Sequence, residues 1–346
     1  MTSATATGNA NGSVMSGAVL EVRDLGVEFP TDAGLVKAVD GMTFHLDERE
    51  TVALVGESGS GKSVTSLAIL GLLPKRARVR GEVVFRGETL TGKSDKEMQP
   101  YRGNRISMIF QDALTALNPV LRVGDQIAEA ITAHHKVEKS DLKARVVGLL
   151  ELVGIPNPST RADQYPHEFS GGMRQRAMIA MSIANEPDVL IADEPTTALD
   201  VTVQAQVLDT IRRIQERTNS AILLITHDLG VVAGLADRVI VMYAGRPVEI
   251  ANIEDTFYAT RHPYTQGLLA SLPRLDTSGD GARKLHPIVG QPPSLIRLPR
   301  GCAFHPRCPI METGVCDSVR PELRHVGAEH QSACHRAELL AGSADR

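Results

Sequence analysis

The chain has 346 residues and a formal net charge of −4, and it lacks a long block of Lys and Arg. This charge balance argues against nucleic acid as a partner, because nucleic-acid binding depends on neutralising phosphates. The length exceeds what one hydrophobic core usually serves, so we expect two domains or one domain with a substantial appendage. The longest apolar run, residues 67–73, is shorter than the roughly 18 residues of a membrane-spanning helix, so we expect a cytosolic chain that does not cross the membrane.

The N-terminal end predicts a tail followed by a small β layer. Residues 1–18 are rich in Ala, Thr, Ser, Gly and Asn and lack the basic start and apolar centre of a signal peptide, so we expect them to be disordered. Apolar and polar residues then alternate over residues 19–29 and 36–46, as in half-buried antiparallel strands. Residues 81–85 continue this pattern and are expected to join the same layer.

A phosphate-binding loop is the strongest motif of the chain. The stretch from Gly56 to Ser63 has the form G-x-x-x-x-G-K-[ST], follows the apolar run Thr51–Val55 and precedes a helical pattern at residues 64–73. Glycines let several backbone N–H groups point at one anion, and the helix N-terminus adds partial positive charge. Lys62 would reach the β- and γ-phosphates, and Ser63 would ligate Mg²⁺. The residues predicted to bind nucleotide here are Gly56, Ser58, Gly59, Ser60, Gly61, Lys62, Ser63 and Val64.

The rest of the first 272 residues predicts alternating strands and helices. Short apolar runs that suit buried strands occupy residues 106–110, 189–192, 221–225 and 238–242. Helical spacing is found over residues 123–134, 140–153, about 172–185 and 201–216. This alternation indicates an α/β fold with a largely parallel sheet, helices on both faces and ligand-binding groups at the carboxyl ends of the strands.

Two further segments carry groups suited to nucleotide chemistry. A buried strand ends in Asp193, which would hold Mg²⁺, and in Glu194, which would act on the attacking water. Ser170, Gly171 and Gly172 begin a helix and could grip phosphate through backbone N–H groups, although Ser170 also suits a simple helix N-cap.

The order of these motifs resembles that of the ATP-binding-cassette (ABC) ATPases over about residues 19–272. The resemblance implies a RecA-like core, an antiparallel β layer and a helical subdomain at about residues 112–170. The segment from Phe169 to Met173 matches the family signature L-S-G-G-Q except for Phe and Met at its ends. In that family two cassettes dimerise head to tail, and the signature of one covers the nucleotide held by the other.

Four more residues take roles implied by the resemblance alone. Phe29 falls at the position of the adenine-stacking aromatic residue, and Asp200 in the loop that contacts the second cassette. Gln111 matches the residue that senses Mg²⁺ and water and links the site to the membrane partner. His227 matches the residue that contacts the γ-phosphate and orients the water. The catalytic set implied is therefore Glu194, His227, Gln111 and Lys62, and the Mg²⁺ set is Ser63, Gln111 and Asp193.

Three other stretches are similar to the ATPase subunits of bacterial oligopeptide and dipeptide importers. They occupy residues 111–119, 261–269 and 301–309. This resemblance implies a second, similar ATPase subunit, two transmembrane permease subunits, an extracytoplasmic peptide-binding protein and a position on the cytoplasmic face of the cell membrane. Nickel or other solute importers of the same group, and a regulatory subunit with a silent site, remain alternatives. A cassette ATPase of translation or DNA repair and an exporter component fit less well.

All four cysteines lie in a Pro-rich segment, residues 273–346, which we expect to be an irregular appendage with little apolar core. Clustered cysteines in a reducing cytosol indicate metal binding more than disulfides. Their spacings match neither ordinary zinc modules nor the bacterial ferredoxin run, so spacing alone does not name the metal. Because some related importer subunits carry one, the resemblance favours a [4Fe–4S] cluster, with Zn²⁺ or reduced thiols as alternatives. The expected ligands are Cys302, Cys308, Cys316 and Cys334.

Overall fold

The structure, a computed structural model, describes residues 17–32, 34–112, 116–197, 199–272 and 287–340. The expected tail lies almost wholly outside these residues. The predicted β layer is confirmed as a four-stranded antiparallel sheet of order β2-β1-β4-β5. Its strands are β1 (Ala18–Thr31), β2 (Gly34–Asp47), β4 (Arg78–Phe85) and β5 (Glu88–Thr89).

A second sheet of eight strands has the order β11-β12-β10-β9-β3-β8-β7-β6. Strands β9, β3, β8, β7 and β6 are parallel, as predicted, whereas β10, β12 and β11 add antiparallel pairs at one side. The parallel strands are β3 (Thr51–Val55), β6 (Ile106–Ile109), β7 (Val189–Asp193), β8 (Ala221–Thr226) and β9 (Arg238–Tyr243). The antiparallel strands are β10 (Arg246–Asn252), β11 (Arg324–His325) and β12 (Gln331–Ser332).

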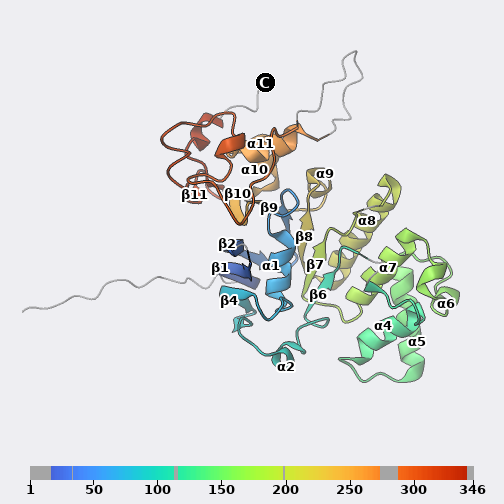
Figure 1. Ribbon diagram of the computed structural model, residues 1–346. Coiled ribbons are helices and arrows are strands. Elements are labelled where there is room, and N and C mark those ends of the chain that lie inside the picture. Colours follow the sequence, from blue (N-terminus) through green and yellow to red (C-terminus); the bar gives the residue numbers. More distant parts are fainter. Residues whose placement is uncertain (1–16, 33, 113–115, 198, 273–286, 341–346) are drawn as a thin grey trace, which may run out of the picture.

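Helices cover this sheet, and α4 to α7 gather on the side away from β1, β2 and β4 (Figure 1). Of these helices, α4, α5 and α6 fall within residues 112–170, where a helical subdomain is expected, and α7 follows them. The longer helices are α1 (Lys62–Ile69), α4 (Val123–Thr132), α5 (Lys139–Leu152), α7 (Gly171–Ser182), α8 (Val201–Thr218) and α11 (Pro263–Ala270). The shorter ones are α2 (Asp95–Met98), α6 (Pro158–Arg161), α9 (Leu229–Val232) and α10 (Ile253–Tyr258), with the 3-10 turns η1 (Pro166–Glu168), η2 (His305–Arg307) and η3 (Ala337–Leu340).

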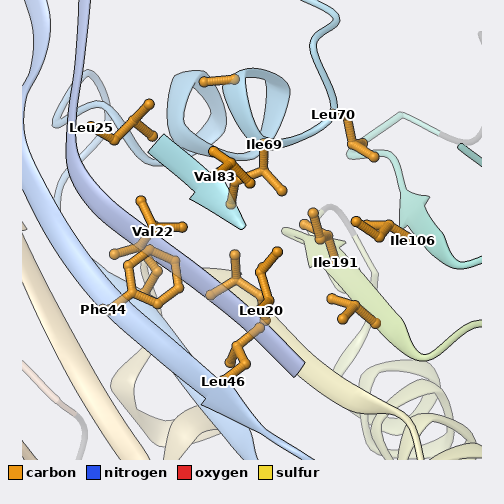
Figure 2. Packing of buried hydrophobic residues seen from close by; sticks show 14 of the residues in the cluster. Leu20, Val22, Leu25, Phe44, Leu46, Ile69, Leu70, Val83, Ile106 and Ile191 are labelled. Atoms are coloured by element: carbon orange, nitrogen blue, oxygen red, sulfur yellow. The ribbon is translucent and has the colours of Figure 1, made fainter. Parts of the chain in front are cut away.

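Burial on both faces explains why the parallel strands are continuous apolar runs. Along β8, Leu223 and Ile225 face a first core cluster shared with the antiparallel layer and α1, while Ile222 and Leu224 face a second cluster with α4, α5, α7 and α8. Figure 2 shows the first cluster, in which Leu20 and other β-layer residues pack toward the parallel sheet. The β layer is thereby fixed to the sheet that carries the phosphate-binding loop.

The C-terminal extension, defined here as residues 287–340, differs in part from expectation. Regular structure is sparse, as predicted, and consists of η2, η3 and the two-residue strands β11 and β12. The sequence analysis did not predict that the extension joins the cassette, but β12 pairs with β10 through Glu249 and Ser332. Phe304 also belongs to a third core cluster with Tyr243 and Tyr264. The extension therefore continues both the sheet and the core.

Two smaller differences concern strand and helix limits. The strand expected at residues 106–110 ends at Ile109, and Phe110 is 43% exposed beyond it. Strand β10 and helices α10 and α11 were not predicted. Among the described residues, no helix is long and apolar enough to span a bilayer.

Candidate nucleotide-binding site

Strand register brings the predicted site residues to one edge of the parallel sheet. Val55 of β3 lies opposite Thr226 of β8, and Asp193 of β7 lies opposite Ile225 of β8. The loops that follow these strands therefore leave the sheet side by side. Ligands of open α/β sheets bind at such carboxyl ends.

The phosphate-binding loop can be formed only with glycine at two positions. A Cβ on Gly56 would lie 2.3 Å from the Met242 carbonyl oxygen, and one on Gly61 would lie 2.3 Å from that of Ala38. Both glycines also have positive φ, 154° and 106°. The loop is thus pressed against β9 and β2, and the buried Oγ of Ser60 has no hydrogen-bond partner among the described residues. Such an unpaired buried hydroxyl fits a loop built to receive a polar ligand.

Lys62 begins α1 and is buried beneath this loop. Its Nζ donates hydrogen bonds to the carbonyl oxygens of Gly56 at 2.7 Å and Glu57 at 3.1 Å. Burial lowers the pKa of Lys62, while the carboxylates of Glu194 and Asp193 oppose that effect. The ammonium group is therefore held at the loop, where it can neutralise phosphate charge.

Ser63 and Asp193 form the pair expected of a Mg²⁺ site. The Ser63 hydroxyl donates a hydrogen bond of 3.1 Å to Oδ1 of Asp193. Burial raises the pKa of Asp193, and the hydrogen bond from Ser63 partly counteracts this. A hydroxyl and a carboxylate are oxygen ligands of the kind Mg²⁺ prefers, so these residues fit that ion.

Three side chains hold the Glu194 carboxylate. Gln111 Nε2 donates to Oε2 at 2.9 Å, Thr197 Oγ1 donates to the same oxygen at 2.8 Å, and His227 Nδ1 lies 3.3 Å from Oε1. Glu194 itself has a left-handed φ of 48°, a strained conformation for this residue type, and its N–H donates to the carbonyl of Ile225. The predicted residues Gln111, Glu194 and His227 are thus brought together.

Sequence reasoning missed two residues that support this carboxylate. Thr197 follows Glu194 by three residues, a spacing at which a hydroxyl can reach back, but threonine is too common for this signal to be specific. Gln175 of α7 is buried and donates a 2.7 Å hydrogen bond to the carbonyl of Pro195, next to Glu194. The helix that begins at the signature segment is therefore connected to the segment carrying the carboxylate.

The signature segment lies beside α8. Ser170 is the N-cap of α7 and accepts a hydrogen bond from the Met173 N–H, while Asp200 caps α8 in the same way. A Cβ on Gly172 would lie 2.7 Å from Cγ1 of Val203 on α8. Within the described ranges, no hydrogen bond joins Ser170, Gly171 or Gly172 to the phosphate-binding loop. Hydrogen bonds of the described residues thus do not join these two predicted phosphate contacts within one chain.

The remaining residues that the sequence predicted to bind nucleotide lie at the margin and tip of the loop. Phe29 near the end of β1 and Val64 on α1 are partly buried against the first core cluster. Ser58 and Gly59 are exposed at the tip of the loop. These positions leave the tip accessible to a ligand from solvent.

The four cysteines converge on one small cavity although they are spread over 33 positions of the chain. Each is a free thiol in the structure, and all four line the same space together with His305 and His335. Burial raises the pKa of Cys302 to about 11 and that of Cys334 to about 12. These thiols are therefore protonated and unreactive unless a metal displaces their protons. The cysteines contributing to this cavity are Cys302, Cys308, Cys316 and Cys334.

Another cluster with metal-ligand chemistry is formed by His45, Asp47 and Glu50, whose ligand atoms lie within 4.8 Å of one another. Arg238 Nη1 lies 2.7 Å from His45 Nε2 and 3.3 Å from Glu50. A guanidinium group already supplies the positive charge there. We therefore interpret the cluster as an ion-pair network.

Two family models match the chain. The model described as ABC transporter matches residues 39–197, and the model described as the C-terminal region of oligopeptide/dipeptide transporters matches residues 248–316. The first match spans the phosphate-binding loop, the signature segment and Glu194. The second spans most of β10, all of α11 and three of the four cysteines.

Similar proteins agree with both matches. The chain is 53% identical to the dipeptide transport ATP-binding protein DppD of Bacillus subtilis, covering 94% of this chain and 98% of the relative. It is also 53% identical to the oligopeptide transport ATP-binding protein OppD of Mycobacterium tuberculosis, over 94% of this chain. The chain spans about half, 53%, of the length of that mycobacterial relative.

Solved structures show the same fold. A dimeric ATP-binding cassette determined in a post-hydrolysis state with ADP and Pi superimposes with a TM-score of 0.61 at 22% identity, over 68% of this chain and 98% of the other. The fold is therefore that of an ABC ATPase cassette. By its relatives and its two family models, the chain belongs to the family of ABC transporter ATP-binding proteins, in the group named for oligopeptide and dipeptide transport.

Proposed function

We propose that this chain hydrolyses ATP to power the import of oligopeptides or dipeptides across the cytoplasmic membrane. The observation that carries the proposal is the Glu194 carboxylate, held by Gln111, Thr197 and His227 next to the Ser63–Asp193 pair. A nucleotide-binding subunit without hydrolytic activity has no need of this arrangement. The peptide assignment rests on the names of the relatives and on the match of the C-terminal region.

The chain's own groups account for the chemistry by positioning and charge. Loop N–H groups and the Lys62 ammonium hold the phosphates of the substrate ATP, and Mg²⁺, when bound by Ser63 and Asp193, would neutralise further phosphate charge. Glu194 orients the attacking water and accepts its proton, while His227 fixes the carboxylate and faces the γ-phosphate. Gln111 links the same carboxylate to the segment that leads into α4. The products are ADP and phosphate.

The placement of the signature segment supports a head-to-tail dimer. Ser170 and Gly171 are exposed, and Asp200 caps α8, whose Val203 lies against Gly172. Because no hydrogen bond of the described residues joins the signature segment to the loop of its own chain, a second, similar ATPase subunit would present its own signature to the nucleotide. Two transmembrane permease subunits and an extracytoplasmic peptide-binding protein complete the proposed transporter, with this chain at the cytoplasmic face of the membrane.

We further propose a division into a nucleotide-binding domain over residues 19–272 and a C-terminal region over residues 273–346 that holds a metal centre. Four thiols around one cavity are a donor set that fits either Zn²⁺ or an iron–sulfur cluster. Of these two we propose a [4Fe–4S] cluster, with Zn²⁺ as the alternative.

Two other functions can be separated from this one by experiment. A nickel or other solute importer of the same group would show ATPase activity that responds to its own solute and not to peptide. A regulatory subunit would bind ATP without turnover, which the complete arrangement around Glu194 disfavours. Stimulation of the assembled transporter by peptide-loaded binding protein distinguishes all three.

The Glu194→Gln variant tests the assignment of the catalytic site. Removing the carboxylate charge should lower ATP turnover in the assembled complex by about 100-fold or more and leave MgATP binding intact. Glu216→Gln, the same change at an exposed site on α8, is the control and should not alter turnover. Undiminished hydrolysis by the Glu194→Gln complex would contradict the assignment.

A further inference from the structure

Arg307 of the C-terminal extension reaches the phosphate-binding loop. Its Nη1 and Nη2 donate to the two carboxylate oxygens of Glu57 at 2.6 and 3.0 Å, and its side chain is only 4% exposed. The guanidinium group also donates to the Tyr243 hydroxyl at 3.3 Å and to the Val289 carbonyl at 3.1 Å. Its carbon lies 5.8 Å from the ring centroids of Tyr243 and Phe304. A long, flexible side chain is thus held in one position at the loop.

Glu57 is bound at each of its polar groups. Its N–H donates to the Tyr264 hydroxyl at 2.8 Å, and its carbonyl oxygen accepts from Lys62 Nζ at 3.1 Å and from the Ser60 N–H at 3.2 Å. The pair with Arg307 holds the remaining group, the carboxylate. Contacts from α11, from α1 and from the extension therefore meet at one residue of the loop.

The negative charge of Glu57 makes its contact with Arg307 important for phosphate binding by the loop. A carboxylate in a loop that binds a polyphosphate repels its ligand unless a cation neutralises it. Arg307 supplies that cation and forms a bidentate pair that turns the carboxylate toward the extension. Without Arg307, the partly buried Glu57 carboxylate would keep its charge beside the bound phosphates.

Arg307 lies in a turn that is flanked by two of the four cysteines. Turn η2 (His305–Arg307) lies between Cys302 and Cys308 in the chain. The His305 N–H donates to the Cys302 carbonyl, the Cys308 N–H to the His305 carbonyl, and the Arg307 N–H to the Phe304 carbonyl. A change in the separation of the two cysteines must alter this turn and with it the guanidinium position.

We propose that Arg307 is a positioning residue through which the four-cysteine centre sets the affinity of the phosphate-binding loop for ATP. The inference rests on the proposed function, because it requires that the loop bind MgATP. It assigns the extension a regulatory role in nucleotide binding. Loss or rearrangement of the metal centre would displace Arg307, leave the Glu57 charge uncompensated and weaken ATP binding.

The first test is charge rescue, measured as the Kd of the full chain for MgATP and as KM and kcat of the assembled transporter. Arg307→Ala should raise Kd and KM roughly tenfold with little change in kcat. Adding Glu57→Gln to Arg307→Ala should restore most of the affinity, because it removes the uncompensated charge. Arg297→Ala, the same change at an exposed position of the same extension, is the control and should leave Kd unchanged.

The second test asks whether the cysteines affect the loop through Arg307. Cys308→Ser should raise the Kd for MgATP in the otherwise unchanged chain. In a chain that already carries Arg307→Ala, it should have no further effect. Cys316→Ser serves as a second variant with the same expected results. Equal effects in both backgrounds, or failure of Glu57→Gln to rescue Arg307→Ala, would overturn the inference. If the unchanged chain itself does not bind MgATP, the proposed function fails instead, so the two failures are distinguishable.

Discussion

The nucleotide site and the cysteine centre are both assembled from distant parts of the chain, but different interactions hold them. Residues of the nucleotide site follow β3, β7 and β8, whose backbone ladders fix them at one sheet edge. Around the cysteine centre, the described part of the extension contributes only η2, η3 and the two short strands β11 and β12, and the start of α11 also lines the cavity. Because strand ladders are sparse here, side-chain contacts must hold the extension in place.

A buried polar contact is one of those side-chain anchors. His330 of the extension lies 2.7 Å from the carboxylate of Glu249 on β10, and both side chains are almost fully buried. The same carboxylate accepts hydrogen bonds from Thr260 Oγ1 and from the Arg261 N–H. Because a buried polar group left unpaired is costly, this contact fixes the extension on β10 in one register.

Alanine at Gly61 should produce the largest difference between the two regions. A Cβ there meets the Ala38 carbonyl at 2.3 Å with φ at 106°, and strain plus overpacking of about 4 kcal/mol corresponds to roughly 1,000-fold weaker MgATP binding. Gly301→Ala creates a similar clash in the extension, 2.4 Å from the Cys316 carbonyl, with φ at 68°. It should weaken MgATP binding by no more than about tenfold, through Arg307. Equal losses in the two variants would contradict the distinction drawn between the regions.

Removing the Phe304 ring should loosen the extension while the sheet remains intact. Phe304 is 2% exposed and packs on the rings of Tyr243 and Tyr264 at centroid distances of 5.2 and 5.4 Å. Phe304→Ala should cost about 3 kcal/mol of local stability. Hydrogen exchange should accelerate in residues 287–340 but not in β3 or β8, and Leu339→Ala, at a 58% exposed position, is the control. Faster exchange throughout the sheet would show that the two regions unfold as one unit.

His262 should give a smaller, pH-dependent effect at the seam between the regions. Complete burial lowers the pKa of His262 from 6.5 to about 4, and its Nδ1 accepts the Tyr264 N–H at the start of α11. Below pH 6.5 the unfolded chain takes up a proton that the folded chain excludes, so stability falls as the pH decreases toward 4. Between pH 6.5 and 5 the loss should be about 1–2 kcal/mol.

His262→Asn tests that effect because it keeps an acceptor for the Tyr264 N–H and removes the titrating ring. Urea unfolding at several pH values should show a flatter dependence for the variant between pH 6.5 and 5. An unchanged slope would assign the pH dependence to other groups.

Most of the parallel sheet could be predicted from sequence because each strand is buried on both faces and so forms a short apolar run. The phosphate-binding loop could be located because glycine is required at Gly56 and Gly61 by close backbone contacts. Asp193 and Glu194 could be identified because one ends a buried strand and the other directly follows it, whereas the role of His227 was implied only by the family resemblance. In each case a local constraint leaves its mark on the residues themselves.

The remaining features depend on contacts that leave no local pattern. The pairing of Arg307 with Glu57 joins residues 250 positions apart, and neither is distinctive in its own segment. Strand β12 has two residues, too few for an alternation of apolar and polar positions to be detectable. The support of Glu194 by Thr197 depends on a side-chain conformation that composition does not specify.

The pairing of β12 with β10 has a consequence for solubility. Without residues 331–332, β12 and its partner β11 would be lost from the sheet, and β10 would present unpaired N–H and C=O groups at the border of the six remaining strands. Such a border is a template for adding strands from other molecules. The small C-terminal strands therefore protect the folded chain from self-association, so shortening the chain at this point carries a risk of aggregation that is unrelated to nucleotide or metal binding.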